Sequence, residues 1–416
     1  MEDEKKLGVY IHIPFCASKC AYCAFYSLAG RDKLMQDYQH ALLRHVREYA
    51  PQLDGYLIDT VYFGGGTPSY YGAGRLISVL NALKKNGHVL RGAEITAEVN
   101  PDSVTREELA AMYRAGFNRL SVGVQSANDA VLKSLGRRHD FARAERAVRD
   151  ARDAGFKNIS VDLIYGLPSQ KRDDWANTIS RAVALKPEHI SCYGLTIEEG
   201  TQLYVFKDSP FLPDDDEQAD MYLYAVDTLS RYGYKQYEVS NFARRGRESA
   251  HNLKYWLGGE YLGLGAAAHS FIAGRRYGIV PDIERYSEGI LYDKSVIETS
   301  EELSDFERAG EYLMLRLRTV YGISEQEYYE IFRCDMDRIL NRLRFFETNG
   351  WAEQHDGRWR FTPTGFLLSN TLIGQVLEEQ TRQRSQISKP WLKATEGEDP
   401  QLTMFAVGEN RALKLF

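Results

Sequence analysis

The sequence predicts an α/β protein with a parallel sheet, in a barrel-like or doubly wound form, and three observations support this. Short runs rich in β-branched or aromatic residues recur along the first half of the 416-residue chain. Segments with helical periodicity separate these runs, and connections of this length join parallel strands. The chain is 44% hydrophobic and 26% charged, an ordinary globular balance that excludes disordered, collagenous and coiled-coil proteins.

The first half of the chain supplies the expected strands and helices in alternation. The expected strands are residues 9–13, 60–63, 94–99, 119–124, 158–164 and 189–195. The expected helices are residues 32–49, 105–115, 142–154, 173–185 and 215–232. Thr105 is followed three residues later by Glu108, a capping-box pattern that predicts a helix start at this point.

The pattern changes after residue 235, where glycines and aromatic residues predict a small mixed capping region over residues 236–300. Three helical patterns and a hairpin signal at Asp356-Gly357 then make residues 301–377 resemble a winged helix. Residues 301–375 hold 9 basic and 13 acidic residues, which favours packing on protein over binding DNA. Residues 378–416 are a C-terminal tail to which the sequence assigns no structure.

Charge and hydropathy exclude several classes of protein. The chain has 52 basic and 58 acidic residues, a net charge of −6, so no overall basic field favours nucleic acid as a partner. It contains no apolar run of about 18 residues that could span a bilayer. Its start is mixed in charge and lacks the pattern of a signal or transit peptide. We therefore expect a cytoplasmic protein without a transmembrane segment.

Three of the five cysteines, Cys16, Cys20 and Cys23, lie within eight residues directly after the first expected strand. Three thiolates with C-x3-C-x2-C spacing can hold three corners of a cubane iron–sulfur cluster, which leaves the fourth iron open to a small molecule. Zinc is an alternative, but the chain has no second ligand pair, and His12 lies inside the strand pattern. Unrelated core cysteines are the remaining alternative, and the one we expect for Cys192 and Cys334.

The cysteine motif resembles that of the radical S-adenosylmethionine (SAM) superfamily, and further motifs agree over about residues 8–375. These are Gly64-Gly-Gly-Thr67-Pro68, Glu98-Val-Asn-Pro101, Gly123-Val-Gln125 and Asp162-Leu-Ile-Tyr-Gly166-Leu-Pro168. The resemblance implies a partial (β/α)6 radical SAM barrel over residues 1–235. It also implies a [4Fe–4S] cluster on Cys16, Cys20 and Cys23, whose electron cleaves SAM to methionine and a 5′-deoxyadenosyl radical.

The resemblance also implies a SAM site beside the cluster. The residues expected to line it are Tyr10, Gly65, Gly66, Thr67, Glu98, Gln125, Arg137 and Asp162. The residues themselves support such a site, because its motifs fall at or near strand ends, where α/β barrels assemble ligand sites. Glycines let a backbone approach a ligand closely, and the charged and amide side chains suit an ammonium, hydroxyls and a carboxylate.

Within the superfamily, several motifs resemble the branch of oxygen-independent coproporphyrinogen III oxidase. They are Tyr10-Ile-His-Ile-Pro-Phe-Cys16, Gly123-Val-Gln-Ser126 and Tyr261-Leu-Gly-Leu-Gly265. The oxidase has a further cysteine two positions after the third cluster ligand, where this chain has Phe25. The haem chaperones of this branch share the phenylalanine. The resemblance therefore implies a chaperone that binds haem and delivers it to acceptor haem proteins.

The sequence His251-Asn-Leu-Lys-Tyr255-Trp256 matches the H-N-x-x-Y-W signature of those chaperones, which is associated with haem. The resemblance makes His251, Asn252, Tyr255 and Trp256 candidates for a haem site. An imidazole is a good axial ligand, aromatic rings can stack on a porphyrin, and nearby arginines can pair with propionates. The candidate arginines are Arg244, Arg245 and Arg247. A packed histidine and a solvated arginine run are the alternatives.

The segment Gly265-Ala-Ala-Ala-His269-Ser270 resembles the branch's G-x-G-A-H-S motif, with Ala267 in place of the second glycine. We expect His269 either to face the cofactor cavity or to be a buried polar anchor.

Two other functions stay open. The chain could be the coproporphyrinogen oxidase or another radical SAM enzyme that modifies a tetrapyrrole, or a winged-helix regulator that senses haem. The sequence does not decide whether SAM is turned over, which tetrapyrrole and acceptor are used, or whether the chain forms a homodimer.

Overall fold

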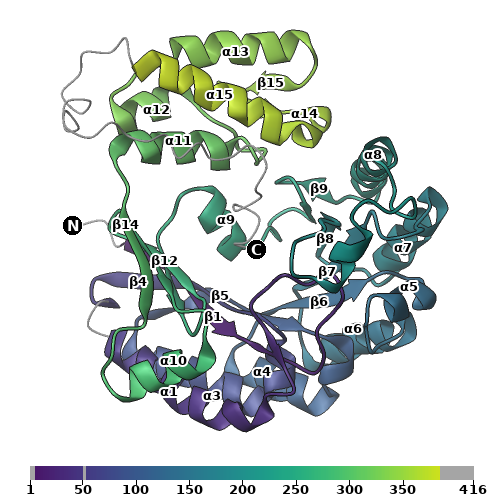
Figure 1. Cartoon of the computed structure of the whole chain (residues 1–416), viewed down its shortest axis with the longest axis vertical. Helices are drawn as coiled ribbons and strands as arrows, with labels where there is room; N and C mark the ends of the chain where they lie inside the picture. The colour runs from purple at the N-terminus through teal and green to yellow at the C-terminus, as the bar shows by residue number, and fades with distance from the viewer. Residues whose placement is uncertain (1–4, 50–52, 385–416) are drawn as a thin grey trace. The chain divides into compact units, whose positions relative to one another are not determined.

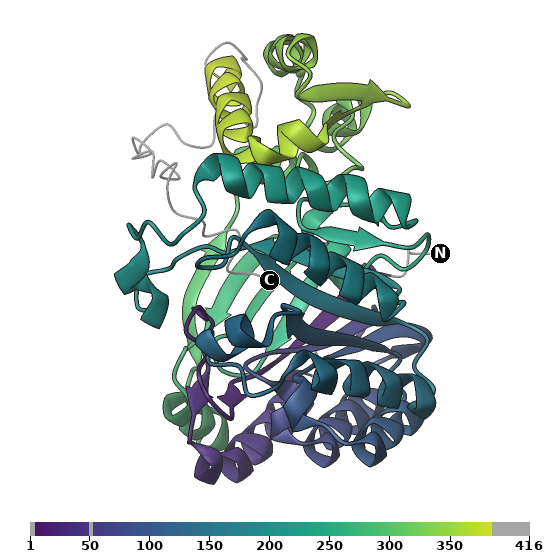
Figure 2. The same ribbon diagram turned by 90° about the vertical axis from the view of Figure 1, so that its right-hand side faces the viewer.

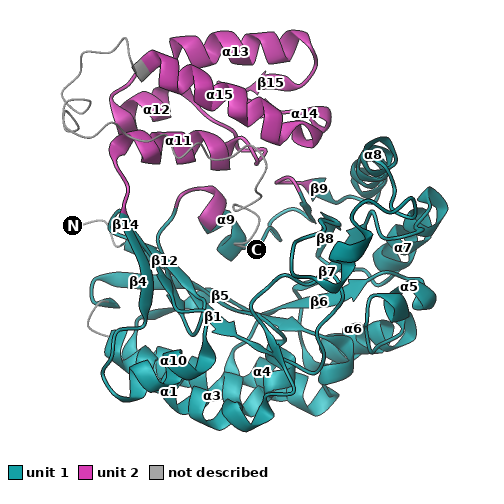
Figure 3. Cartoon of the chain, viewed as in Figure 1, with its two compact units in different colours: residues 1–235, 240–254, 259–301 teal, residues 236–239, 255–258, 302–416 magenta. Residues whose placement is uncertain are grey.

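The computed structural model describes residues 5–49 and 53–384 of the chain (Figure 1). The chain divides into two compact units, which Figure 3 colours separately. Unit 1 comprises residues 1–235, 240–254 and 259–301, and unit 2 comprises residues 236–239, 255–258 and 302–416. Within the described residues, no helix is both long enough and apolar enough to cross a membrane.

Unit 1 is built on one long sheet whose centre is parallel. Its central strands are, in order, β1 (Lys5–Ile13), β4 (Tyr56–Gly65), β5 (Val89–Val99), β6 (Arg119–Gln125), β7 (Ile159–Tyr165) and β8 (His189–Gly194). Each strand pairs in parallel with the next one in this order. These six strands contain the six apolar runs of the sequence almost completely, so the predicted α/β fold with a parallel sheet is confirmed.

The sheet continues beyond both ends of this parallel centre. β11 (Tyr261–Leu264) pairs in parallel with β1, and β10 (Asn241–Ala243) pairs antiparallel with β8. Outside β11 lie β12 (His269–Ile272), β13 (Arg275–Ile279) and β14 (Ile297–Glu302), and outside β10 lies β9 (Lys235–Gln236). The first and last parallel strands therefore each have another neighbour and do not pair with each other. The sheet is an open, partial barrel.

Helices join the parallel strands and cover the outer side of the sheet (Figures 1 and 2). They include α1 (Met35–Tyr49), α3 (Ala73–Asn86), α4 (Arg106–Ala115), α6 (Phe141–Ala154), α7 (Arg172–Ala184) and α8 (Asp215–Arg231). The capping box predicted at Thr105 is present: its hydroxyl accepts from the Glu108 amide at 3.2 Å, and the Glu108 carboxylate accepts from the Thr105 amide at 2.9 Å. Most of the buried apolar side chains of these helices and strands form one continuous core. A smaller separate cluster includes Ala21 of the loop after β1.

The mixed region after residue 235 adds two short helices to the edge strands. They are α9 (Ala250–Trp256) and α10 (Ile283–Leu291). The division between the two units falls inside α9, between Lys254 and Tyr255. The haem-associated motif of the sequence lies on this helix.

Unit 2 contains the three helices and the hairpin that the sequence predicts. They are α11 (Asp305–Arg316), α12 (Glu325–Phe332), α13 (Asp337–Thr348), β15 (Ala352–His355) and β16 (Arg358–Phe361). Asp356 and Gly357 join the two strands with φ angles of 48° and 73°, as a type I′ turn requires. The short helix α14 (Pro363–Leu367) and the longer α15 (Ser369–Arg384) follow. The first seven residues of the expected tail are thus helical, and the rest of it lies outside the described residues.

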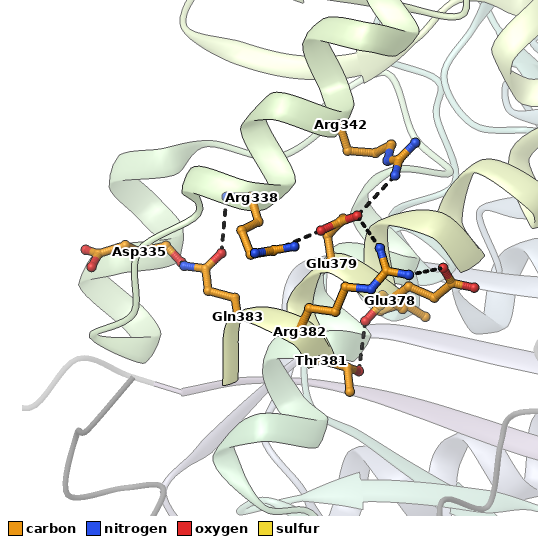
Figure 4. Close-up of polar contacts among 9 residues, drawn as sticks. Asp335, Arg338, Arg342, Glu378, Glu379, Thr381, Arg382 and Gln383 are labelled. Atoms are coloured by element: carbon orange, nitrogen blue, oxygen red, sulfur yellow. Dashed lines mark hydrogen bonds and ion pairs between the residues drawn. The ribbon is translucent and has the colours of Figure 1, made fainter. Parts of the chain in front are cut away.

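A buried carboxylate attaches α15 to α13 (Figure 4). Glu379 accepts from Arg338 Nε at 3.0 Å, from Arg342 Nη2 at 3.0 Å and from Arg382 Nη1 at 2.9 Å. Burial acts to raise the pKa of Glu379, but the hydrogen bonds from Arg342 and Arg338 outweigh it and lower the pKa below the usual range. This carboxylate therefore stabilises unit 2 at neutral pH.

We expect Glu379→Ala to reduce the free energy of unfolding of unit 2 by about 1 kcal/mol, because three partly exposed guanidinium groups lose their shared partner. Denaturant unfolding followed by tryptophan fluorescence measures this, since Trp351 and Trp359 lie in unit 2. Glu378→Ala is the control, because its 3.7 Å contact with Arg382 is exposed on both sides. Equal unfolding midpoints for the two variants would contradict the prediction.

Candidate functional site

The cluster loop, residues 14–29, leaves the sheet at the end of β1 and folds back on itself. Cys16 lies in β2 (Phe15–Cys16), which pairs with β3 (Leu28–Ala29), and the Cys23 amide donates to the Cys20 carbonyl at 3.2 Å. All three thiols are free. Burial raises the pKa of Cys16 and of Cys23, and the charges of the neighbouring cysteines raise both further. The three sulfurs are thus close enough to interact electrostatically.

Polar groups next to the sulfurs fit an iron–sulfur cluster. Thr67 Oγ1 donates to Cys16 Sγ at 3.4 Å, and Arg137 Nη1 donates to Cys20 Sγ at 3.6 Å. Such donors favour the thiolate form that binds iron. In the described residues no three metal-binding side chains surround a single point, and none need to, because each cysteine of a cubane binds a separate iron.

His12 orders this loop through both of its ring nitrogens. Its Nε2 lies 3.0 Å from the Tyr26 carbonyl, to which it donates, so its Nδ1 accepts from the Tyr10 hydroxyl at 3.1 Å. Burial lowers the pKa of His12 to about 4, which keeps the ring neutral. With both nitrogens occupied, His12 supports the loop rather than offering a fourth metal ligand.

The glycine turn after β4 packs directly on the cluster loop. The Gly66 amide donates to the Ile13 carbonyl and the Thr67 amide to the Phe15 carbonyl, both at 2.8 Å. A Cβ atom at Gly66 would lie 2.8 Å from the Phe15 carbonyl oxygen, and one at Gly65 would lie 2.6 Å from the His12 ring. The close backbone approach predicted for these glycines is therefore made to the protein's own loop.

Glu98 is the last residue but one of β5 and lies beside this turn. Its carboxylate accepts from the Tyr62 hydroxyl at 3.0 Å and from the Gly65 amide at 3.2 Å. Burial raises the pKa of Glu98 to about 7. A cationic ligand next to Glu98 would reverse this shift, so the carboxylate is suited to bind an ammonium group.

Arg137 connects the cluster loop with the ends of β5 and β6. Its Nη2 donates to the Gly123 carbonyl at 2.8 Å and also to the Asn100 side chain, while Nη1 reaches Cys20. Gln125, predicted for the same site, ends β6 at a register shift with a φ of 66°. Asn100 belongs to this arrangement although it was not among the predicted site residues. Its place in the Glu98-Val-Asn-Pro motif was the available signal.

Asp162 is held by serines of three adjacent strands. Its carboxylate accepts from Ser121 and Ser191 at 2.9 Å and from Ser160 at 3.3 Å. Burial raises the pKa of Asp162, and the serine hydrogen bonds oppose this. Asp162 lies close enough to Glu98 for its charge to raise the pKa of Glu98. The serines were not predicted, because only the strand register brings them together.

The inner side of the sheet also carries α9 with His251. His251 is 1% exposed, its Nδ1 lies 2.8 Å from Thr60 Oγ1, and its ring stacks on Tyr62 with centroids 5.2 Å apart. The Glu94 carboxylate accepts from the amides of Ala250 and His251 at 3.1 and 3.0 Å. In this conformation His251 is a packed histidine, the alternative to a haem ligand that the sequence left open.

The other three haem candidates lie on the same helix. Asn252 is half-buried, and its backbone amide donates to Ser249 Oγ at 3.4 Å. Tyr255 is also half-buried, and Trp256 is 3% exposed. Lys254 between them forms an ion pair of 2.9 Å with Asp59.

The arginine run follows β10, and His269 lies in β12, where its charge adds to burial in lowering the pKa of His12. Arg244 donates to the Pro187 carbonyl and covers the Tyr234 ring, and Arg245 and Arg247 are exposed. His269 is exposed, which excludes the buried polar anchor, and Ala267 has the left-handed φ of 63° that the branch's glycine would adopt without strain. Cys192 and Cys334 are buried, as expected of small core residues.

The buried histidines predict how stability depends on pH. Burial lowers the pKa of His251 to about 3 and that of His12 to about 4, so these rings bind protons only on unfolding between these values and pH 6.5. Below pH 6.5 the unfolded chain therefore binds more protons than the folded chain. The free energy of unfolding then decreases as the pH is lowered, by about 1.4 kcal/mol per pH unit for each such histidine. Urea unfolding of wild type and His251→Gln between pH 7.5 and 5.5 measures this. We expect a shallower pH slope for the variant, and an equal slope would contradict the assignment.

The sequence of this chain is similar to two family models and to several known proteins. Residues 10–182 match the model of the radical SAM superfamily, and residues 303–368 match that of the HemN C-terminal domain. The protein named heme chaperone HemW of Haemophilus influenzae is 33% identical over 384 residues, which cover 90% of this chain and 98% of that protein. HemW of Bacillus subtilis is also 33% identical, with coverage of 89% and 99%.

A solved structure shares the fold. Coproporphyrinogen III oxidase (HemN) of Escherichia coli, described as a radical SAM enzyme, superposes with a TM-score of 0.78 over 91% of this chain and 90% of that one. The two sequences are 23% identical. The partial radical SAM barrel with a C-terminal domain is therefore the architecture of this chain.

Proposed function

We propose, from the premise that this chain belongs to the HemW family of haem chaperones in the radical SAM superfamily, that it binds haem and delivers it to acceptor haem proteins. The similarity to HemW proteins over about 90% of the chain is the observation that carries this function. Phe25 agrees with it, because the loop has a 43% exposed phenylalanine where the oxidase has a further cysteine.

Cys16, Cys20 and Cys23 would hold a [4Fe–4S] cluster, which when bound with SAM supplies an electron for cleavage of the sulfonium. Beside it, Glu98 offers a carboxylate for the ammonium group of SAM, and Arg137 offers a guanidinium for the carboxylate. The whole proposed SAM set is Tyr10, Gly65, Gly66, Thr67, Glu98, Gln125, Arg137 and Asp162. Asp162, held in its serine cluster, would add a second carboxylate near Glu98 that attracts the same cationic group.

Haem would bind at α9, with His251 as the axial ligand and Asn252, Tyr255 and Trp256 beside it. The burial of His251 makes this a site that opens, which suits a protein that must both accept and release its cargo. When His251 coordinates iron through Nε2, its Nδ1 would donate to Thr60 Oγ1, the kind of support that metal-bound histidines receive.

Haem titration of wild type and His251→Ala, followed by absorption spectroscopy, tests the site. We expect the variant to bind haem at least about tenfold more weakly and with a changed spectrum, since it loses an axial ligand. His40→Ala is the matched control, because that histidine is exposed on α1, on the outer side of the sheet. Unchanged affinity and spectrum in His251→Ala would remove His251 from the site.

The fold shared with HemN supports one alternative, a radical SAM oxidase that acts on coproporphyrinogen or another tetrapyrrole. Anaerobic incubation with SAM, a reductant and coproporphyrinogen distinguishes the two functions. Vinyl-bearing product over multiple turnovers would establish the oxidase and overturn a purely chaperone function.

We also propose how the parts of the chain divide this work. Residues 1–235 would hold the cluster and SAM, residues 236–300 would supply the haem site, and residues 301–377 would pack against protein. We place the chain in the cytoplasm, where the cluster cysteines stay reduced. A homodimer gated by the cluster and SAM is part of this proposal, and size-exclusion chromatography with and without SAM tests it.

A further inference from the structure

Two cysteines of the cluster loop receive a hydrogen bond at their sulfur from a side chain outside the loop. Cys16 receives the Thr67 hydroxyl at 3.4 Å, and Cys20 receives the Arg137 guanidinium at 3.6 Å. Both donors come from residues of the proposed SAM site.

The Thr67 hydroxyl is directed at sulfur rather than at the helix that follows it. Thr67 occupies the N-cap position of α2 (Pro68–Tyr71), where a threonine hydroxyl usually accepts from the backbone of the first turn. It makes no side-chain cap hydrogen bond here. The backbone amide of Thr67 donates to the carbonyl of Phe15 at 2.8 Å. Because Phe15 directly precedes Cys16, this hydrogen bond holds Thr67 beside the Cys16 thiol. The usual local role of this threonine is thus given up for a contact with the thiol.

The Arg137 guanidinium is oriented by contacts on its other side. Nη2 donates to the Gly123 carbonyl at 2.8 Å and to the Asn100 side chain, which leaves Nη1 directed at Cys20. The turn before Arg137 also contacts the cluster loop, since Ala21 donates its amide to the Leu135 carbonyl at 3.0 Å.

We propose that Thr67 and Arg137 are positioning residues for the cluster, and that they raise its reduction potential by donating hydrogen bonds to the sulfurs of Cys16 and Cys20. A donor to a ligand sulfur draws electron density from the iron–sulfur bond. It therefore stabilises the reduced, more negative cluster more than the oxidised one. Arg137 adds a positive charge to the same effect. This inference rests on the cluster of the proposed function, and not on haem.

Thr67→Val and Thr67→Ser test the first donor with closely matched side chains. Valine keeps the shape of threonine and removes the hydroxyl, whereas serine keeps the hydroxyl. The full chain is reconstituted anaerobically without SAM or haem, and the potential is measured by redox titration followed by electron paramagnetic resonance. We expect a lower potential for Thr67→Val and a potential near that of wild type for Thr67→Ser. Equal potentials for wild type and Thr67→Val would overturn the role of Thr67.

A vibrational measurement separates the hydrogen bond from a general disturbance of the loop. Resonance Raman iron–sulfur frequencies should shift between H2O and D2O in wild type and Thr67→Ser, and shift less in Thr67→Val.

If Thr67→Val does not retain its iron and sulfide, the reduction potentials of Arg137→Gln and Arg137→Lys test the inference instead. A potential that is lowered in Arg137→Gln and largely kept in Arg137→Lys supports the inference, and wild-type potentials in both overturn it.

The outcome is independent of the chaperone function. A chain with these redox shifts that binds no haem would overturn the haem site and leave this inference standing. A chain that binds haem normally and shows no redox shift in any variant would do the reverse.

Discussion

Gly66→Ala is expected to displace the cluster loop and to prevent stable cluster assembly. The added methyl group would lie 2.8 Å from the Phe15 carbonyl oxygen and 2.9 Å from the Ile13 carbonyl oxygen, and both are backbone atoms that cannot turn aside. Either the loop or the turn after β4 must move, which breaks the two 2.8 Å hydrogen bonds between them. We expect a cost of about 3 kcal/mol, at the upper end for overpacking.

Anaerobic reconstitution followed by iron and sulfide analysis measures this effect, together with denaturant unfolding. The control is Gly74→Ala in α3, where a Cβ atom meets nothing within 4 Å. That variant should be neutral or gain up to about 1 kcal/mol, because alanine favours a helix over glycine. Full cluster content in Gly66→Ala would show that the contact between turn and loop is not needed.

Weakening the contacts that hold α9 is expected to increase the apparent affinity for haem. Asp59→Asn removes the partner of Lys254 in an ion pair whose side chains are 24% and 10% exposed. Glu94→Gln weakens the carboxylate that accepts from the first amides of α9. If each change destabilises the closed helix by about 1 kcal/mol, the double variant shifts the population toward the open form roughly thirtyfold.

Haem titration followed by the Soret absorbance measures this shift, with circular dichroism to establish that the fold is retained. Asp227→Asn is the control, because its ion pair with Arg231 lies on the exposed face of α8. An affinity equal to or below that of wild type in the folded double variant would contradict an opening of α9. If His251→Ala leaves haem binding unchanged, an increase in the double variant would locate the site elsewhere under α9.

The elements that are specified locally are the ones the sequence predicts. The strand runs, the capping box at Thr105 and the Asp356-Gly357 turn each depend on neighbouring residues, and all are present. α15 was not predicted, although Leu372, Ile373 and Val376 recur with helical spacing and are buried. Its second half is polar and is held by the contacts of Glu379 with arginines of α13. Ionic contacts with another helix leave little signal in the segment's own sequence, so the extent of the helix could not be predicted.

The candidate site divides in the same way. The cysteines, the glycines and Glu98 stand out because each belongs to a short motif at the end of a strand. The burial of His251 depends on Thr60 and Glu94, which precede it by 191 and 157 residues, and no local pattern encodes such pairs. The serines around Asp162 likewise come from three strands, so only the sheet register reveals them.

The position of β1 in the sheet has a consequence for the assembly of the protein in the cell. β1 is hydrogen-bonded on both sides, to β4 and to β11, so the stem of the cluster loop belongs to the interior of the fold. A small zinc domain draws its folding energy from the metal, whereas this stem is completed by the sheet itself. Loading of iron and sulfide would then be a local, late step on a folded acceptor. A chain that has lost its cluster to oxygen would then stay folded and could be loaded with iron and sulfide again.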